Sequence, residues 1–246
     1  MHPFLRGLLD LLYPPRCQVC HRFAPEPFCP ECLAAVTLIR PPVCCHCGTP
    51  LDPMAQGPDE CAECRSAKRT PISRVRSAGV YQGPLRQAIL ALKFGGKRAL
   101  ALPLAKILAE LYLSGLCKSS DFDCVCPVPL DRQRQRERGF NQAQLLARYF
   151  SETVGLPLRD DLLQRVRPTL PQAMLPTEQR SKNVRGAFAL TPHAEVKDAR
   201  VLLVDDVYTT GSTLKECARI LRQGGATEVC VITLARPRPA WMPEKE

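Results

Sequence analysis

Four Cys-x-x-Cys pairs near the N-terminus constrain the fold of this chain more than any other feature. The pairs are CQVC (17–20), CPEC (29–32), CCHC (44–47) and CAEC (61–64). A Cys-x-x-Cys knuckle turns the backbone so that both thiolates point at one ion about 2.3 Å away, and two knuckles complete a tetrahedron. The four pairs therefore predict about two structural zinc sites.

The connectors between these pairs, such as APEP and GTPLDPMAQGPD, are rich in proline and polar residues and supply little material for a core. Metal has to replace that core, and structural zinc contributes roughly 10–16 kcal/mol in small modules. The spacing leaves an interleaved pairing open, and also a degenerate site in which Cys45 or His46 substitutes for a ligand. The simplest ligand sets are sequential: Cys17, Cys20, Cys29 and Cys32 for one ion, and Cys44, Cys47, Cys61 and Cys64 for the other.

The first residues, MHPFLRGLLDLLYPP, are apolar but carry Arg6 and Asp10 and lack the small-residue cleavage site of a signal peptide. Leucines recur on one helix face, at Leu5, Leu8, Leu9 and Leu12. We therefore expect a short docking helix over residues 1–16. No apolar run approaches the ~18 residues of a membrane span, so we expect a cytoplasmic protein. In that compartment the 14 cysteines indicate metal rather than disulfides.

After the cysteine-rich module of residues 17–70, the pattern changes to apolar strands that alternate with amphipathic helices. Strands are expected at residues 77–83, 123–130, 161–167, 186–190, 200–204 and 228–235, and helices at 84–94, 104–111, 139–155 and 212–226. This alternation predicts an α/β domain over residues 77–240, with a mainly parallel sheet flanked by helices. Ligands of such sheets bind beyond the carboxyl ends of the strands.

One strand end carries the most informative motif, VLLVDDVYTTGSTL (201–214). An apolar strand runs into Asp205 and Asp206, and the loop Thr209–Thr213 then leads into a helix. Amides and hydroxyls at a helix N-terminus bind anions, and Gly211 lets the backbone come close to a ligand. Two carboxylates would repel a bare phosphate. A ribose phosphate suits both the acid pair and the loop, because its hydroxyls can donate to the aspartates while its phosphate binds in the loop. Magnesium would bridge the hydroxyls and a pyrophosphate.

Three other interpretations of the motif fit less well. A P-loop requires G-x-x-x-x-G-K-[ST], which FGGKR (94–98) does not match. A phospho-receiver domain needs most of its fold after the acidic strand end, but only 40 residues follow Asp206. A helix N-cap explains Ser212 or Thr213 but leaves the paired aspartates unexplained.

The motif VLLVDDVYTTGST resembles the phosphoribosyl-pyrophosphate (PRPP) signature of type I phosphoribosyltransferases. Over nearly its whole length the chain resembles the ComF family, which includes ComFC and GntX-like proteins. The resemblance rests on the cysteine knuckles, on Y-x-G-x-L-R…LKF, on PVPL…RGFNQ, and on R…NVRGAF before the PRPP loop. It implies a type I phosphoribosyltransferase-like fold that carries an N-terminal double zinc ribbon.

The resemblance also implies roles for individual residues. Asp205 and Asp206 would hold the ribose hydroxyls and stabilise an oxocarbenium-like transition state. The 5′-phosphate would bind the loop residues Thr209, Thr210, Gly211, Ser212 and Thr213. The segment after VCPVPL would be the pyrophosphate loop, and magnesium would accompany the substrate. The family is linked to natural transformation, as a cytoplasmic factor that handles single-stranded DNA after entry.

Basic residues supply candidate partners for the pyrophosphate. The net charge is +10, and Arg132, Arg134, Arg136 and Arg138 follow the predicted pyrophosphate strand. Their guanidinium groups would bind a pyrophosphate or a DNA backbone, and a solvated basic loop is the simpler alternative for the first three. Lys93, beside the FGG turn, is another anion candidate. The proline-rich segment 168–186 is expected to form a lid that contacts the ligand through Gln172 and Arg180.

These inferences lead to two hypotheses from different functional classes. In the first, the chain is a PRPP-binding phosphoribosyltransferase-like protein that acts in competence and DNA uptake. In the second, it is a non-catalytic adaptor that binds single-stranded DNA or proteins of the competence machinery, and its PRPP pocket is a sensor or a relic.

Overall fold

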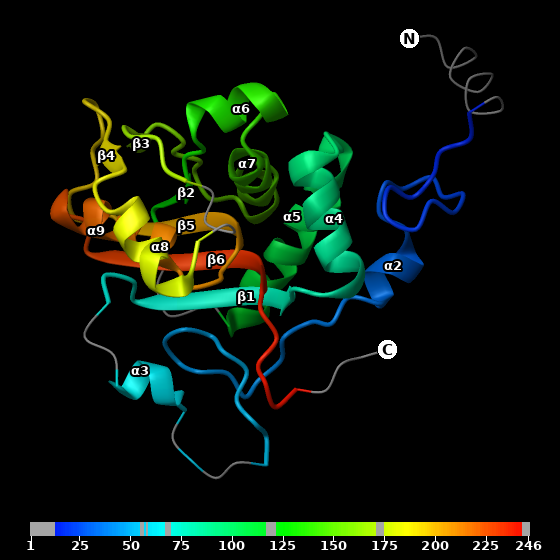
Figure 1. The fold of residues 1–246 in the computed structure, drawn as a ribbon, viewed down its shortest axis with the longest axis horizontal. Helices are drawn as coiled ribbons and strands as arrows, with labels where there is room; N and C mark the ends of the chain where they lie inside the picture. The colour runs from blue at the N-terminus through cyan, green and yellow to red at the C-terminus, as the bar shows by residue number, and fades with distance from the viewer. Residues whose placement is uncertain are drawn as a thin grey trace.

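The computed structural model describes residues 13–54, 57, 59–66, 70–116, 122–170 and 175–242. At its centre lies a four-stranded sheet with the strand order β1-β6-β5-β2 (Figure 1). These strands are β1 (Arg74–Val80), β2 (Cys124–Pro127), β5 (Arg200–Val207) and β6 (Glu228–Arg236). All three pairings are parallel, so the predicted α/β fold with a parallel sheet is confirmed.

Side chains of β5 alternate between two apolar layers, because successive residues of a strand point to opposite faces. Leu202 and Val204 pack into the layer built mainly by α4, α5 and α7. Val201 and Leu203 pack into the other layer, which α9 covers. The bounds of these helices are α4 Gly83–Phe94, α5 Ala101–Leu111, α7 Gln142–Val154 and α9 Ser212–Gln223. The buried sheet is therefore covered on both faces, as parallel sheets require.

The apolar stripes predicted from the sequence are the buried faces of these helices. In α4 the stripe consists of Leu85, Ala88, Ile89 and Leu92, all fully buried. The i, i+3, i+4, i+7 spacing gathers these side chains on one side of the helix. Lys93 follows Leu92 in the last turn, so its side chain leaves the buried stripe beside the carboxyl end of β5.

The cysteine-rich segment covers the outer edge of β1, where a free strand would expose unpaired N–H and C=O groups. Leu38 forms an antiparallel bridge with Gly79. Farther along the same strand, the Val75 N–H donates to the His46 carbonyl at 2.7 Å. Figure 1 shows the blue and cyan segment running below β1. The module is thus joined to the sheet by backbone hydrogen bonds.

The remaining elements lie around the sheet. β3 and β4 form a separate antiparallel pair, with Leu163 opposite Leu190. The bounds are α2 Pro30–Ala34, α3 Ala62–Ser66, the 3₁₀ helix η1 Arg98–Leu100, the π-helix η2 Tyr112–Leu116, α6 Arg132–Arg138, β3 Leu163–Arg165, α8 Thr177–Val184 and β4 Phe188–Leu190. In the part of the chain that is described, no helix combines the length and apolarity needed to cross a membrane.

One expectation about local structure is corrected. The arginine-rich segment after β2 is not a loop but the short helix α6, because Asp131 caps its first turn by accepting from the Gln133 N–H at 3.0 Å. Gly139, with φ of 75°, ends it. The segment 168–186, expected to form a lid, contains the helix α8. The expected docking helix, up to Leu12, lies outside the described residues.

Candidate functional site

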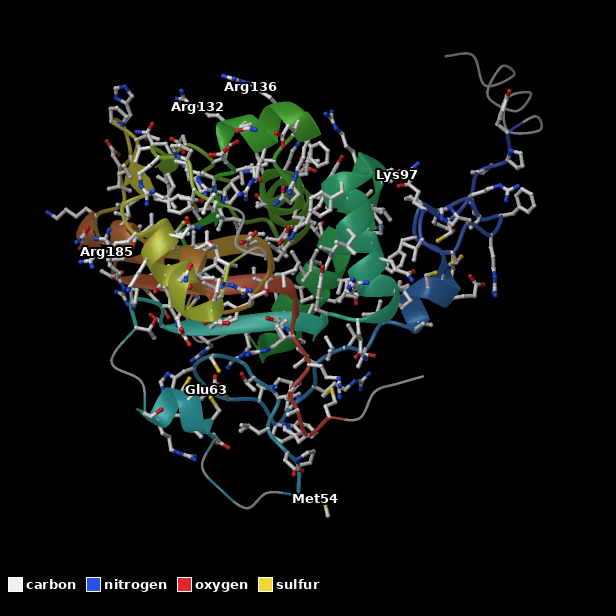
Figure 2. The ribbon with its side chains drawn as sticks, in the orientation of Figure 1. Met54, Glu63, Lys97, Arg132, Arg136 and Arg185 are labelled. Atoms are coloured by element: carbon white, nitrogen blue, oxygen red, sulfur yellow. The ribbon has the colours of Figure 1, made fainter. Side chains whose placement is uncertain are left out.

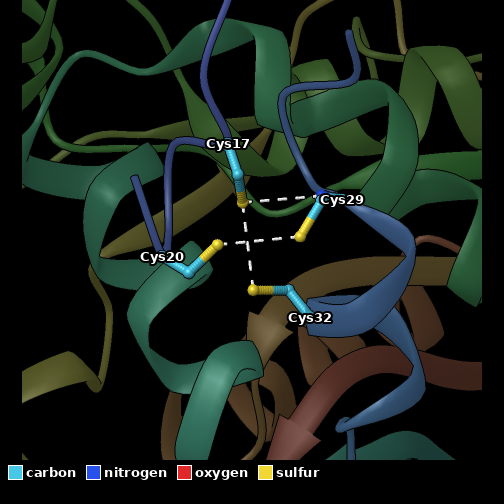
Figure 3. Close-up of side chains that lie close together, drawn as sticks. All are labelled: Cys17, Cys20, Cys29 and Cys32. Carbon is cyan, nitrogen blue, oxygen red and sulfur yellow. Dashed lines mark hydrogen bonds between the residues drawn. The ribbon is translucent and has the colours of Figure 1, made fainter. Parts of the chain in front are cut away.

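Each half of the cysteine-rich module gathers four thiols into a cluster. The sulfur atoms within each cluster all lie within 4.8 Å of one another. Cys17 Sγ is 3.9 Å from Cys32 Sγ, and Cys20 Sγ is 3.7 Å from Cys29 Sγ (Figure 3). Four thiolates at about 2.3 Å from a tetrahedral zinc ion are separated by about 3.8 Å. The geometry therefore fits zinc, with each tetrad built from consecutive knuckles.

Backbone N–H groups point at the first thiol of each tetrad. The N–H groups of Val19 and Cys29 donate to Cys17 Sγ, and that of Cys61 donates to Cys44 Sγ at 3.4 Å. Burial acts to raise the pKa of Cys17 and Cys44, but these hydrogen bonds outweigh it and lower both values to about 6. The two thiols are thus prepared for the thiolate form that binds zinc.

The alternative ligands lie outside the tetrads. Cys45 is exposed, and the imidazole of His46 is 3.5 Å from a Glu60 carboxylate oxygen. Cys124, Cys126, Cys217 and Cys230 are buried in the α/β domain.

The second candidate site is a cavity of about 400 Å³ at the carboxyl ends of the strands. Its lining includes Tyr81 after β1, the segment 128–130 after β2, and Asp205 and Asp206 at the end of β5. The loop Thr209–Thr213 completes one wall. The strand ends of a parallel sheet meet at one edge, and this brings together segments far apart in the sequence.

The loop after β5 has the conformation that its glycine predicts. Gly211 has φ of 70°, and a Cβ atom there would lie 2.5 Å from the Tyr208 ring, so only glycine fits. Thr210 Oγ1 and Ser212 Oγ are 2.9 Å apart. Helix α9 starts at Ser212 with no side-chain cap. The first turn of α9 therefore faces the cavity with backbone amides and hydroxyls, as an anion site requires.

The two aspartates differ in their surroundings. Asp206 is buried, and its Oδ1 is 2.8 Å from Lys93 Nζ. Burial acts to lower the pKa of Lys93, but the Asp206 carboxylate reverses the effect and raises it. Asp205 Oδ1 accepts from the Asp206 N–H at 2.8 Å. Burial and the Asp206 charge raise the pKa of Asp205 to about 7.

One atom of the acid pair is left without a partner. Asp206 Oδ2 is buried and accepts no hydrogen bond from the described residues. An unsatisfied buried carboxylate oxygen is costly. A hydroxyl donor or a hard cation would satisfy it, and Mg²⁺ prefers such oxygen ligands.

Helix α6 divides its arginines between two faces. Arg134 and Arg138, four residues apart and hence on one face, line the cavity. Arg138 Nη1 donates to Gln142 Oε1 at 2.8 Å, and its guanidinium lies 4.9 Å from the centre of the Phe94 ring. Figure 2 shows Arg132 and Arg136 pointing away from the body of the molecule.

Of the other predicted contacts, Arg180 lines the cavity, and its Nε donates to the Leu175 carbonyl at 3.0 Å. Gln172 lies outside the described residues. Arg165 on β3 was not predicted, because one arginine in a short strand gives no signal. Its side chain lines the cavity and is 9% exposed, its Nε has no hydrogen-bond partner among the described residues, and Asp131 Oδ2 is 3.9 Å away. Burial lowers its pKa.

Comparisons with known proteins find similarity in both regions. A family model described as a phosphoribosyl transferase domain matches residues 136–246, and one described as a double zinc ribbon domain matches residues 8–69. Competence protein F of Haemophilus influenzae is 36% identical over 200 residues, covering 79% of this chain and 85% of that protein. The DNA utilization protein YhgH of Salmonella typhimurium is 34% identical, covering 85% and 89%. Competence protein ComFC of Bacillus subtilis is 29% identical, covering 86% and 85%.

Proposed function

The chain belongs to the ComF family, with Competence protein F and the DNA utilization protein YhgH, and from this membership we propose that it binds magnesium and PRPP and acts in the uptake and use of DNA. One observation carries the binding proposal: the acid pair and the hydroxyl-rich loop line the same cavity. A sugar phosphate has neighbouring hydroxyls and a phosphate, which suit these two walls.

The loop Thr209–Thr213 takes the 5′-phosphate. Its amides and hydroxyls are hydrogen-bond donors, and Gly211 lets the backbone take its left-handed turn over the Tyr208 ring. The start of α9 adds the positive end of a helix dipole.

Asp205 and Asp206 take the ribose hydroxyls. The buried Asp206 Oδ2, which lacks a partner among the described residues, supports this role. Magnesium, when it is bound with the pyrophosphate, supplies charge neutralisation, and the acid pair is the oxygen donor set in the cavity that fits it. When pyrophosphate leaves the anomeric carbon, the two carboxylates offset the positive charge that develops on the sugar.

Three arginines of the cavity lining take the pyrophosphate. Arg134 and Arg138 come from α6, and Arg165 comes from β3. Guanidinium groups bind phosphate oxygens in pairs and keep their charge at neutral pH. Their place in the cavity lining supports a role in binding the leaving group.

The two cysteine tetrads hold structural zinc in this proposal. All four ligands at each site come from the protein, which leaves no open coordination position for catalysis. Metal analysis of the purified protein is expected to find about two zinc ions per chain. A metal-free folded protein would contradict the assignment.

Titration calorimetry with magnesium and PRPP tests the ligand assignment. We expect wild-type protein to bind, and Asp205→Asn combined with Asp206→Asn to abolish the binding. Asp198→Asn is the matched control, because this aspartate is exposed and precedes β5, whose opposite end carries the acid pair. Binding that survives the double substitution would contradict the role of the acid pair.

A second candidate function is a non-catalytic adaptor that binds single-stranded DNA. It is favoured by the outward face of α6, where Arg132 and Arg136 are exposed (Figure 2). Replacing both with glutamine is expected to weaken DNA binding and reduce its salt dependence, while PRPP binding stays unchanged. A screen for pyrophosphate release over nucleobases and amines separates transferase from adaptor, because only a transferase releases it.

A further inference from the structure

Arg236, the last residue of β6, is joined to the second cysteine tetrad. Its side chain is buried, and its Nη1 donates to the Cys47 carbonyl at 2.6 Å. Its other terminal nitrogen donates to Thr49 Oγ1, which lies 3.1 Å from Cys47 Sγ. Figure 1 shows the red end of the chain passing the cyan and blue cysteine-rich segment. The guanidinium therefore depends on groups whose positions a metal at Cys47 fixes.

The same arginine supports two residues next to the cavity. Its carbonyl accepts from the N–H of Tyr81, a cavity-lining residue, at 2.7 Å. Its guanidinium lies 5.6 Å from the centre of the Tyr208 ring. The Tyr208 N–H is held in turn by the Ala235 carbonyl at 2.9 Å.

Tyr208 lies directly against the loop Thr209–Thr213. A Cβ atom on Gly211 would be 2.5 Å from both Cζ and Oη of this tyrosine. The phenol end of the ring therefore fills the space beneath the loop backbone, where Gly211 takes its left-handed conformation. If the ring moves, that backbone loses its support.

We propose that Arg236 and Tyr208 are positioning residues for the loop Thr209–Thr213, and that metal at the second tetrad orders the loop through them. The ligand part of this inference rests on the proposed function, whereas the ordering of the loop does not. Metal holds the knuckle that contains Cys47, the knuckle holds Arg236, and Arg236 holds Tyr208 under Gly211. When the metal leaves, a buried guanidinium loses the acceptors that satisfy it, a loss that is expensive for a charged group.

The first tetrad provides a matched comparison, because α2, which carries Cys32, packs against α4. Cys29→Ser with Cys32→Ser removes the second knuckle of the first site. Cys61→Ser with Cys64→Ser removes the second knuckle of the second site and leaves Cys47, Thr49 and Arg236 in place. Both double variants are expected to lose one zinc ion, and only the second is expected to affect the loop.

The readout is amide hydrogen exchange of residues 208–214 in ligand-free protein, followed by the affinity for magnesium and PRPP. For the Cys61/Cys64 variant we expect loop exchange to rise, and affinity to fall, by roughly tenfold or more, the effect of losing a charged hydrogen bond. The Cys29/Cys32 variant should stay close to wild type in both. Unchanged loop exchange after zinc loss at the second site, or equal changes from both sites, would overturn the inference.

Substitutions of Arg236 and Tyr208 test the proposal with all eight cysteines intact. They replace the cysteine variants if those do not fold. Arg236→Gln is expected to keep both zinc ions and still speed loop exchange, while Arg236→Lys restores part of the protection. Tyr208→Phe keeps the ring and should behave like wild type, whereas Tyr208→Ala should not. Wild-type loop exchange in Arg236→Gln would contradict the proposal. If wild-type protein binds no PRPP but loop exchange follows the second tetrad, the proposed function fails and the coupling stands.

Discussion

The cysteine-rich module and the α/β domain are folded by different forces. In the module, eight thiols converge in two tetrads, and the connectors between them are rich in proline. In the domain, both faces of the sheet are covered by apolar layers in which Leu203, Val231 and their neighbours are almost fully buried. The module is expected to be held by a few strong bonds to metal, and the domain by the burial of many apolar side chains away from water.

This difference explains how chemistry is divided between the regions. Each tetrad is closed, and the two tetrads take eight of the nine cysteines of the module. The sheet, by contrast, is stable enough to leave costly groups unsatisfied at its carboxyl edge, such as Asp206 Oδ2 and Arg165 Nε. Unsatisfied buried groups in a native fold are typical of functional sites.

The largest effect is expected from removing zinc. Chelation should cost the module roughly 10–16 kcal/mol at each site, so residues 13–66 should lose their amide protection. Strands β5 and β6 should keep theirs, because they pair with each other and the apolar layer under α9 contains none of the eight tetrad cysteines. Hydrogen exchange with and without chelator measures this, and zinc-saturated chelator is the control. Simultaneous loss of protection in both regions would show that the domain does not stay folded without the module.

A cavity in the sheet core tests whether apolar packing stabilises the α/β domain independently of zinc. Leu203→Ala should lower the free energy of unfolding by about 2–5 kcal/mol, because Leu203 is fully buried, and zinc content should not change. Leu102→Ala is the matched control, since that side chain is 42% exposed. Urea denaturation with parallel metal analysis measures both. A loss of zinc in Leu203→Ala would show that the regions are not separable.

The ion pair at the cavity should have an intermediate effect. Lys93→Met leaves the buried Asp206 carboxylate without its cation and should cost about 2–3 kcal/mol, less than a fully buried pair because Lys93 is partly exposed. Adding Asp206→Asn should recover most of that loss. Denaturation of the single and double variants measures the coupling. A double variant less stable than Lys93→Met would contradict the assignment of the pair.

The smallest effect is the pH dependence that Asp205 imposes. Its pKa is about 7 in the folded protein, well above that of an unfolded aspartate, so the folded state holds the proton more tightly. Stability from this group is therefore present at low pH and lost as the pH rises through 7, by about 1–2 kcal/mol between about pH 5.5 and 8. Asp205→Asn should remove that fall. The measurement is the free energy of unfolding of wild type and variant across this pH range, in zinc-saturated protein. A difference between the two proteins that does not change with pH would contradict the raised pKa of Asp205.

Much of this arrangement is predictable from the sequence, because its strongest patterns are local. The apolar stripe of α4 follows directly from the spacing of its residues, whereas Gly211 was predicted for a close approach to a ligand and its contact with Tyr208 came only from the structure. Helix α6 was missed because its seven residues are all polar, so no apolar periodicity indicates a helix there. Its capping residues Asp131 and Gly139 were the available signal.

Contacts between distant segments are the part that the sequence does not predict. Lys93 was expected to meet an anionic ligand, and its observed partner is the Asp206 carboxylate, more than a hundred residues away. Arg165 and Arg236 look like ordinary strand residues until the fold brings the first to the cavity and the second to Cys47. Such pairings depend on topology, which no single motif encodes.

The most direct test of the division between the regions is hydrogen exchange of zinc-loaded protein with and without magnesium and PRPP. We expect the ligand to slow exchange most in the loop 209–214 and in the segment 128–131 after β2. Protection that appears first in the cysteine-rich module, with the loop after β5 unchanged, would contradict this expectation.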